Sequence, residues 1–292
     1  MSAALHPASR LKALILAPEI LVMPGAFDPI SAKLIEEAGF AAIQCSGAGL
    51  SFAHLGLPDY SLMSMGEMVE RTRRIAQAVT IPVMADGDTG FGNAVNVHYA
   101  VREFERAGAA GVNLEDQVIP KRCGHLDGKE LVAIGEMEAK VRAARDAADD
   151  PDFVINARTD ALAVEGLPAA VGRANAYLAA GATMAFIDGL ETVEQARALV
   201  AGIRGPVAVN VAEGGRSRDL TVAQLQAAGV ARVSFPGTAL FAAIRAMRTV
   251  LRELKASGDP GTYADRIASF GEAMELMGMR EVRALEARYL AG

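Results

Sequence analysis

The sequence predicts an α/β fold, a (β/α)8 barrel of the TIM type followed by extra C-terminal helices. Eight short apolar runs lie along the 292 residues, and stretches with helical periodicity separate them. The runs do not alternate strictly, which is typical of parallel strands buried on both faces. Nearly every run ends in a polar residue. Because the carboxyl ends of barrel strands meet at one face, we expect these residues to converge there.

The expected strands are Ile20–Met23, Ala41–Cys45, Ile81–Ala85, Ala110–Leu114, Phe153–Ala157, Met184–Ile187, Pro206–Val209 and Arg232–Phe235. The expected helices are Pro29–Ala38, Met65–Val79, Ala94–Ala107, Ile134–Ala148, Leu167–Ala180, Val193–Ile203, Val222–Ala228 and Thr238–Lys255. Several of these helices are followed by a glycine, such as Gly39 and Gly108, which can adopt the left-handed conformation that ends a helix.

Two segments depart from the strand–helix repeat. The long, basic segment from Gln117 to Leu131 is expected to be a lid over the active face. After the barrel (residues 1–257), the tail (258–292) is expected to form helices over Tyr263–Leu276 and Glu281–Leu290. This tail packs either on its own barrel or on a neighbouring subunit, and the sequence leaves both arrangements open.

Composition excludes several classes of protein. A net charge of −6, with acids and bases interspersed, argues against nucleic acid as a partner. No stretch of about 18 uncharged apolar residues occurs, so no membrane span is expected. Met1–Lys12 lacks the apolar centre of a secretory signal. Cys45 and Cys123 are far apart, and free thiols favour a cytoplasmic location.

An acidic cluster follows the third expected strand. Asp86 and Asp88 are two residues apart, so on a strand both carboxylates would point to one face. Such oxygen ligands suit Mg²⁺, with Mn²⁺ as a substitute. Asp59 and Glu115 are further candidates for this metal site. The alternative is ordinary turn chemistry at Asp-Gly and Thr-Gly, but Asp116 beside Glu115 favours a cation that relieves the repulsion.

The expected lid contains a cysteine among cations. Lys121 and Arg122 precede Cys123, and Gly124 and His125 follow it. Neighbouring positive charges lower the pKa of a thiol, which can then serve as a nucleophile or a proton donor. The alternative is a solvated charged loop that happens to contain cysteine.

Small residues follow the second expected strand. The backbone N–H groups of Ser46, Gly47 and Ala48 can face a carboxylate or enolate oxygen, or they can belong to a plain strand-to-helix turn.

Two further strand ends carry candidates for substrate binding. Arg158 can bind a substrate carboxylate bidentately, and its alternative is an ion pair with Asp160 or another acid at the barrel mouth. Asn210 can hydrogen-bond substrate or serve as a turn residue.

Taken in order, these segments resemble the isocitrate lyase/phosphoenolpyruvate mutase superfamily over nearly the whole chain. The matching segments are Pro24–Asp28, Ser46–Gly49, Leu55–Asp59, Asp86–Gly92, Glu115–Gln117, Lys121–His125, Ala157–Ala161 and the region of Asn210. The cysteine-containing lid resembles the carbon–carbon lyase branch, whose members cleave 2-methylisocitrate or 2,3-dimethylmalate.

The resemblance implies a barrel with magnesium at its mouth, usually in a homotetramer that exchanges a C-terminal helix between subunits. It implies retro-Claisen (retro-aldol-type) cleavage of a 2-hydroxy acid that carries a further carboxylate, with release of pyruvate. The implied metal ligands are Asp86, Asp88 and Asp59, and the implied catalytic residues are Cys123, Arg158 and Glu115. The implied substrate-binding residues are Ser46, Gly47, Ala48, Lys121, Gly124, His125, Asp188 and Asn210.

The chain departs from the lyase pattern at four places. Gln44 and Cys45 stand where tyrosine is usual before the Ser-Gly segment, Asn113 replaces a histidine, Asp188 a glutamate and Phe241 an arginine. Loss of a cation favours a small dicarboxylate of the 2-alkylmalate type over a tricarboxylate. The alternatives are an oxaloacetate decarboxylase or a phosphonate mutase or hydrolase on the same scaffold, and a non-catalytic barrel that binds a small acid.

Overall fold

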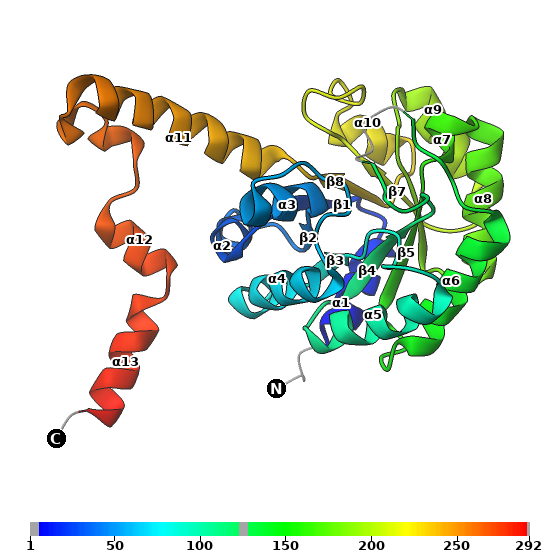
Figure 1. The fold of residues 1–292 in the computed structure, drawn as a ribbon, viewed down its shortest axis with the longest axis horizontal. Helices are drawn as coiled ribbons and strands as arrows, with labels where there is room; N and C mark the ends of the chain where they lie inside the picture. Colours follow the sequence, from blue (N-terminus) through cyan, green and yellow to red (C-terminus); the bar gives the residue numbers. More distant parts are fainter. Residues whose placement is uncertain (1–5, 123–127, 291–292) are drawn as a thin grey trace. The chain divides into compact units, whose positions relative to one another are not determined.

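The fold is a closed barrel of eight parallel strands in the order β1 to β8, so the predicted (β/α)8 architecture is confirmed (Figure 1). This computed structural model describes residues 6–122 and 128–290. The strands are β1 Leu21–Ala26, β2 Ile43–Cys45, β3 Val83–Asp86, β4 Gly111–Glu115, β5 Val154–Thr159, β6 Met184–Ile187, β7 Val207–Asn210 and β8 Arg232–Phe235. All eight predicted runs therefore form strands, with ends displaced by up to three residues.

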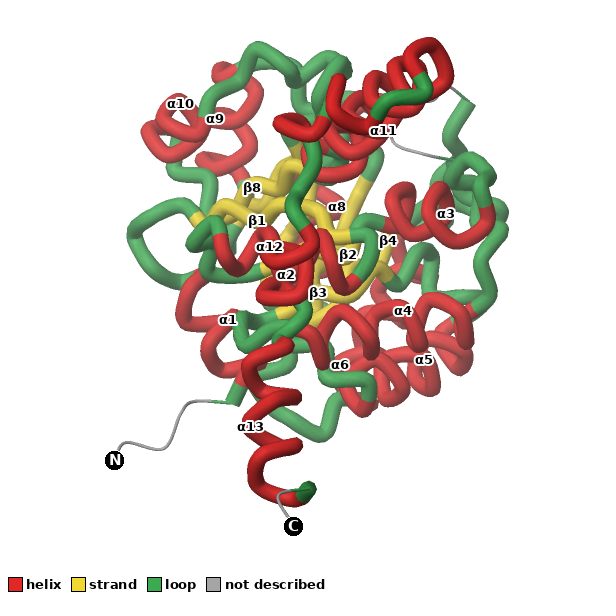
Figure 2. Tube along the Cα trace, turned by 90° about the vertical axis from the view of Figure 1, so that its left-hand side faces the viewer, coloured by secondary structure: helices red, strands yellow, loops and turns green. Residues whose placement is uncertain are grey.

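Helices surround the strands (Figure 2). Those of the barrel are α1 Pro7–Ile15, α2 Pro29–Glu37, α3 Gly47–Leu55, α4 Met65–Ala78, α5 Ala94–Arg106, α6 Ile134–Ala147, α7 Ala161–Val164, α8 Leu167–Ala179, α9 Val193–Gly202 and α10 Val222–Ala227. The sequence did not predict α1, α3 or α7. In α3 the Ser46 side chain accepts a hydrogen bond from the N–H of Gly49, and this cap offsets the low helix propensity of two glycines.

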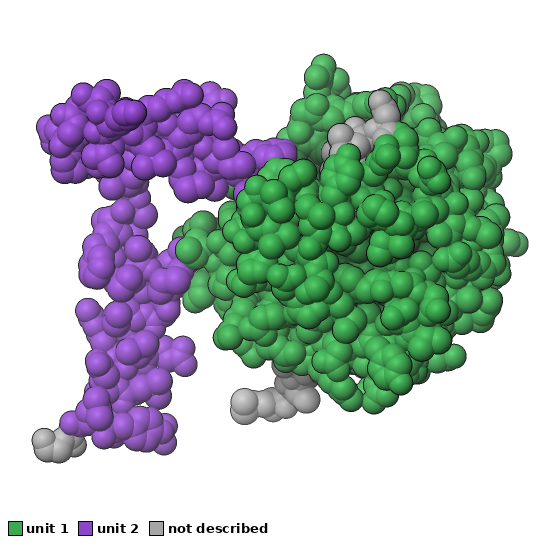
Figure 3. Space-filling model, in the orientation of Figure 1, with its two compact units in different colours: residues 1–239 green, residues 240–292 purple. Residues whose placement is uncertain are grey.

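The C-terminal elements are α11 Thr238–Ser257, the short 3₁₀ helices Pro260–Thr262 and Ala264–Arg266, α12 Phe270–Leu276 and α13 Met279–Tyr289. The helix expected from Tyr263 starts only at Phe270, because Ser269 forms a capping box with Glu272. The chain divides into two compact units, Met1–Ala239 and Leu240–Gly292 (Figure 3). That boundary falls within α11, and the expected division at residue 257 stays a prediction. None of the described helices is long and apolar enough to cross a membrane.

Side chains that point into the barrel recur at every second strand position. Met84, Phe186 and Ala208 belong to one buried cluster that includes residues from the first halves of several strands. Two residues further along the same strands stand Asp86, at the end of β3, Asp188, just past β6, and Asn210, at the end of β7. The strand period therefore places these three polar side chains at the mouth, one layer above Met84, Phe186 and Ala208.

The amino end of the barrel is covered by α1. Its Leu11 and Ile15 are fully buried and pack in the same cluster as Leu21, Ala110 and Val154, which stand at or next to the start of their strands. Burial of such side chains contributes about 2 kcal/mol each. The interior is therefore closed at this end.

Candidate active site

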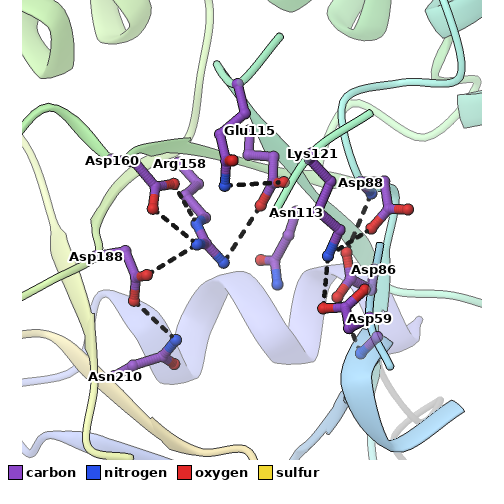
Figure 4. A network of polar contacts seen from close by, with 12 residues as sticks. Asp59, Asp86, Asp88, Asn113, Glu115, Lys121, Arg158, Asp160, Asp188 and Asn210 are labelled. Atoms are coloured by element: carbon purple, nitrogen blue, oxygen red, sulfur yellow. Dashed lines mark hydrogen bonds and ion pairs between the residues drawn. The ribbon is translucent and has the colours of Figure 1, made fainter. Parts of the chain in front are cut away.

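The carboxyl ends of the strands gather most of the predicted site residues into one polar network (Figure 4). Those within it are Asp59, Asp86, Asp88, Glu115, Lys121, Arg158, Asp188 and Asn210. Ser46 caps α3, and Gly47 and Ala48 form the first turn of that helix. Cys123, Gly124 and His125 lie outside the described residues.

Arg158, on β5, is the centre of one half of the network. Its Nε and Nη2 donate to the two oxygens of Asp160 at 2.8 and 3.0 Å, and Nη2 also donates to Asp188 Oδ2 at 2.8 Å. Nη1 lies 3.3 Å from Glu115 Oε2. These acids raise the pKa of Arg158 well above its usual value although burial opposes them. The alternative expected from the sequence, an ion pair with Asp160, is thus present. The guanidinium remains a positive charge at the mouth.

Glu115 is almost fully buried at the end of β4. Burial raises the pKa of its carboxyl to about 8, although the charges of Arg158 and Lys121 act to lower it. Gln117 donates to its Oε1 at 3.4 Å and also to the carbonyl oxygen of Arg122 at 2.9 Å. Glu115 is thus connected to the base of the expected lid.

Asp188 and Asn210 form the side of the site next to Arg158. Asn210 Nδ2 donates to Asp188 Oδ1 at 3.2 Å, and Ser234 Oγ donates to Asn210 Oδ1. Asn210 is therefore a member of the hydrogen-bond network of the mouth as well as the last residue of β7.

Asp86 is held by two backbone N–H groups. Gly47 donates to its Oδ2 at 3.0 Å, and Asp88 donates to its Oδ1 at 3.1 Å. β3 ends at Asp86, and Asp88 has a φ of 46°. The expectation that strand alternation aligns the two carboxylates was wrong: a turn, stabilised by this N–H bond, brings Asp88 back beside Asp86.

Lys121 connects the loop after β4 to the acids of the other half of the network. Its Nζ lies 2.7 Å from Asp59 Oδ2 and 3.0 Å from Asp88 Oδ1, and all three side chains are largely buried. Burial raises the pKa of Asp88 to about 6, and the Lys121 charge counteracts part of that rise. The same acids raise the pKa of Lys121 well above its usual value, although burial opposes them.

The acids around Lys121 suit a hard divalent cation. Asp88 Oδ1 is buried with the Lys121 ammonium as its close partner, and the carboxylates of Asp59 and Asp86 are nearby. Mg²⁺ commonly takes one or two carboxylates and completes its shell with water and substrate. In this conformation the Lys121 ammonium contacts Asp59 and Asp88, and no three described His, Cys, Asp or Glu side chains converge as a ligand set. The neighbouring carboxylates of Asp86 and Asp88 nevertheless match the one or two that Mg²⁺ takes, so the donor chemistry fits the implied metal.

Asp116 does not join the mouth, although it follows Glu115. It faces the helices, where the hydroxyls of Thr159 and Tyr177 donate to its Oδ2 at 2.7 Å each. Arg173 Nη1 approaches the same oxygen at 3.3 Å. The expectation that Asp116 adds to the acidic repulsion at the mouth was wrong, because adjacent strand residues point to opposite faces.

One partner at the mouth, Lys129, was not predicted from the sequence. Lys129 Nζ lies 2.9 Å from Asp160 Oδ1, and together with Arg158 it lowers the pKa of Asp160 to about 2 against the effect of burial. The expected lid segment is fastened at its two ends, where Val118 N–H donates to the Glu130 carbonyl and Val132 N–H to that of Asp116. The signal in the sequence that could have indicated the contact with Asp160 was the presence of Lys129 in the basic segment from Gln117 to Leu131.

Comparison with known proteins places the chain in a family. Residues 11–255 match the family model for phosphoenolpyruvate phosphomutase. The chain belongs to this family. It is 41% identical over 288 residues to 2,3-dimethylmalate lyase of Eubacterium barkeri, covering 99% of this chain and all of that protein. It is 40% identical to 2-methylisocitrate lyase of Aeropyrum pernix, covering 97% and 91%.

A solved structure of phosphonopyruvate hydrolase in complex with oxalate and Mg²⁺ has a TM-score of 0.90 and 37% identity, covering 98% of this chain and 100% of that chain. The predicted superfamily resemblance is therefore confirmed.

Proposed function

We propose that this protein is a magnesium-dependent carbon–carbon lyase that cleaves a 2-alkylmalate-type 2-hydroxy acid into pyruvate and a second carboxylate. The observation that carries the proposal is the presence, in one polar network at the barrel mouth, of the Arg158 cation and of the carboxylates of Asp86 and Asp88. The lyase names of two similar proteins support it.

Asp86 and Asp88, with Asp59 beside them, are the residues that would hold the metal. Bound Mg²⁺ supplies Lewis-acid stabilisation of negative charge on substrate oxygens. The backbone N–H groups of Gly47 and Asp88 keep Asp86 oriented for this task. Lys121 neutralises Asp59 and Asp88, and its contacts with them would have to rearrange when a cation binds.

The protein's own residues account for the binding of the substrate and for the stabilisation of charge. A carboxylate of the substrate binds at Nη1 of Arg158, which no described carboxylate approaches closer than 3.3 Å. A bidentate contact would require Asp160 or Asp188 to give up its hydrogen bond to this guanidinium. Glu115 and Asp160 keep that guanidinium aligned. The N–H groups of Ser46 and Gly47 already donate to the Ala26 carbonyl and to Asp86, so the Ala48 N–H in the first turn of α3 is the one that would favour negative charge on a substrate oxygen.

The bond changes follow from the substrate class. The C2 hydroxyl gives its proton to a base at the mouth, the C2–C3 bond breaks, and C2, which carries a methyl group in 2,3-dimethylmalate, becomes the keto carbon of pyruvate. The electron pair of that bond enters the carboxylate on C3, which gives an enediolate. Protonation at C3 completes the second product, and the resemblance assigns this proton to the thiol of Cys123.

A dicarboxylate fits the described mouth better than a tricarboxylate does. Asn156 Nδ2 donates a hydrogen bond to Asn113 Oδ1 at 2.6 Å, so these two positions carry neutral amides rather than cations. Asp188 adds a negative charge beside Arg158. A third substrate carboxylate would face these groups without a new cation among the described residues of the mouth.

The test is an assay for pyruvate release, coupled to lactate dehydrogenase, with Mg²⁺ and a panel of 2,3-dimethylmalate, other 2-alkylmalates, 2-methylisocitrate and oxaloacetate. We expect the highest kcat/KM for a 2-alkylmalate. Arg158→Lys and Cys123→Ser should each reduce kcat at least about 100-fold. A clear preference for 2-methylisocitrate would contradict the dicarboxylate proposal. Turnover of oxaloacetate alone, retained in Cys123→Ser, would favour the decarboxylase alternative.

An alternative of another class is a barrel that binds a small acid without catalysis, and adding phosphonopyruvate to the panel separates it from a phosphonate mutase or hydrolase. Calorimetric titration with oxalate in the presence of Mg²⁺, combined with no turnover of any compound in the panel, would support this alternative. Pyruvate formation from one 2-alkylmalate would exclude it.

We also propose that the protein is a cytoplasmic homotetramer. The described part of the C-terminal unit exposes many large apolar side chains, of which Phe270 is 80% and Leu290 76% exposed. Apolar surface of this kind favours association with copies of the same chain. Light scattering after gel filtration tests the assembly, and a mass of about 30.5 kDa, that of one chain, would contradict it.

A further inference from the structure

Arg232 is a fully buried cation inside the barrel. It is the first residue of β8, and its side chain is 0% exposed. Its Nη2 donates to Gln44 Oε1 at 2.5 Å and its Nε points to the Met23 sulfur at 3.3 Å. Nη1 has no hydrogen-bond partner in the part of the chain that the structure describes.

The Arg232 guanidinium lies in the interior layer beneath the mouth. β8 and β2 do not pair with each other, because β1 lies between them, so the bond to Gln44 crosses the interior of the barrel. The Phe186 ring centroid is 5.5 Å from Arg232 Cζ and 5.4 Å from Arg158 Cζ. One aromatic ring therefore contacts both the cation of the mouth and the cation of the interior layer.

No described carboxylate forms an ion pair with Arg232, and its hydrogen-bond acceptors, an amide oxygen and a thioether, are neutral. Burial lowers the pKa of this guanidinium to about 9, and the Asp86 carboxylate acts to raise it. The group therefore stays charged at neutral pH. A buried charge without a counter-ion is costly, and its field is weakly screened in the interior.

We propose that Arg232 acts as a fixed positive charge one side-chain layer beneath the mouth, where it strengthens binding of the anionic substrate and weakens binding of the divalent cation. This inference rests on the proposed function, because it takes both ligands to bind at the mouth. Arg232 therefore does not touch the substrate. Its positive charge acts electrostatically on the mouth, across the layer that contains Phe186 and on the carboxylate of Asp86.

The proposal predicts effects of opposite sign on the affinities for the two ligands. Removing the charge should weaken the binding of an anion and tighten the binding of a cation. Damage to the fold would instead weaken both, because both need the same arrangement of Asp86, Asp88 and Arg158.

Three variants separate charge from packing. Arg232→Met removes the charge and keeps most of the volume. Gln44→Glu keeps the hydrogen bond to the guanidinium but neutralises it. Gln44→Met removes the bond and leaves the charge.

Binding of Mn²⁺ alone is measured by electron paramagnetic resonance, and binding of oxalate by calorimetry in saturating Mg²⁺. For Arg232→Met and for Gln44→Glu we expect the Kd for oxalate to rise about three- to tenfold and the Kd for Mn²⁺ to fall about two- to fivefold. Gln44→Met should keep both constants close to those of the unmodified protein.

The outcomes distinguish the two proposals. If the unmodified protein binds neither Mn²⁺ nor oxalate, the proposed function fails, and this inference with it. If it binds both, but Gln44→Glu and Arg232→Met leave both constants unchanged or weaken both, the Arg232 inference fails and the proposed function stands. Should Arg232→Met not fold, Gln44→Glu against Gln44→Met decides alone.

Discussion

The backbone N–H of Gly47 donates to Asp86 Oδ2 at 3.0 Å, and this bond joins the first turn of α3 to the end of β3. A Cβ at position 47 would lie 2.4 Å from the same oxygen, which is closer than any real contact of this kind. Only glycine therefore allows the helix N-terminus to approach this carboxylate.

Gly47→Ala should displace Asp86 and weaken Mn²⁺ binding by about tenfold or more, the equivalent of one lost hydrogen bond to a charged group. Titration with Mn²⁺ measures this. The matched control is Gly66→Ala, because a Cβ at the exposed residue 66 of α4 meets nothing within 4 Å. Equal affinity of both variants for Mn²⁺ would show that the Gly47 contact has no part in metal binding.

Lys121→Met should destabilise the metal-free protein by about 3–5 kcal/mol, because it leaves two buried carboxylates without their cation. Added Mg²⁺ should recover more stability in this variant than in the unmodified protein. Thermal unfolding in EDTA and in Mg²⁺ gives both values. Lys12→Met, which removes a half-exposed ion pair with Asp152, should leave the melting temperature nearly unchanged in both conditions. No extra stabilisation of Lys121→Met by Mg²⁺ would argue against a metal at these acids.

Tyr177→Phe should lower stability by about 1–2 kcal/mol, because Asp116 loses one of its buried donors. Since Asp116 faces away from the mouth, KM for the substrate should change little. Urea unfolding and steady-state kinetics measure the two effects. Tyr99→Phe, at a residue that is 61% exposed, is the control and should leave stability unchanged. A large rise in KM for Tyr177→Phe would mean that the network reaches the substrate.

The thiol of Cys45 should resist alkylation in the folded protein. It is 0% exposed, and burial raises its pKa to about 12. The ionised, reactive form is therefore scarce below that pH, and the rate of labelling should stay near background from pH 7 to 9. The measurement uses Cys123→Ser, in which Cys45 is the only thiol, and urea-unfolded protein as the positive control. A labelling rate that climbs about tenfold per pH unit and levels off near pH 9 would contradict this expectation.

The strands were predictable because parallel strands that are buried on both faces appear in the sequence as nearly continuous apolar runs. Apolar runs such as Met184–Ile187 and Arg232–Phe235 coincide with β6 and β8 residue for residue. Helix starts at Ser64 and Thr192 also carry local signals, since both residues form capping boxes. The segment of α3 has two glycines in its first three residues, so its helix depends on the Ser46 cap and on packing.

The site was predictable in its members but less so in its geometry. The strand period brings Asp86, Glu115, Arg158 and Asp188 to one face, and sequence reasoning could use that period. It could not locate the strand end at Asp86, so the turn at Asp88 was missed. The same period already implies that Asp116, next to Glu115, faces the other side of the barrel wall, but it was not applied to this residue. Arg232 was visible as a lone cation in an apolar run, but its neutral surroundings depend on residues distant in sequence.

The closure of the amino end of the barrel by α1 determines the route that substrate and products can take. With Leu11 and Ile15 blocking that side, reactants must enter and both products must leave by the same opening. Each product must therefore pass the residues of the mouth on its way out, so substitutions there should change the rate of product release as well as the binding of substrate.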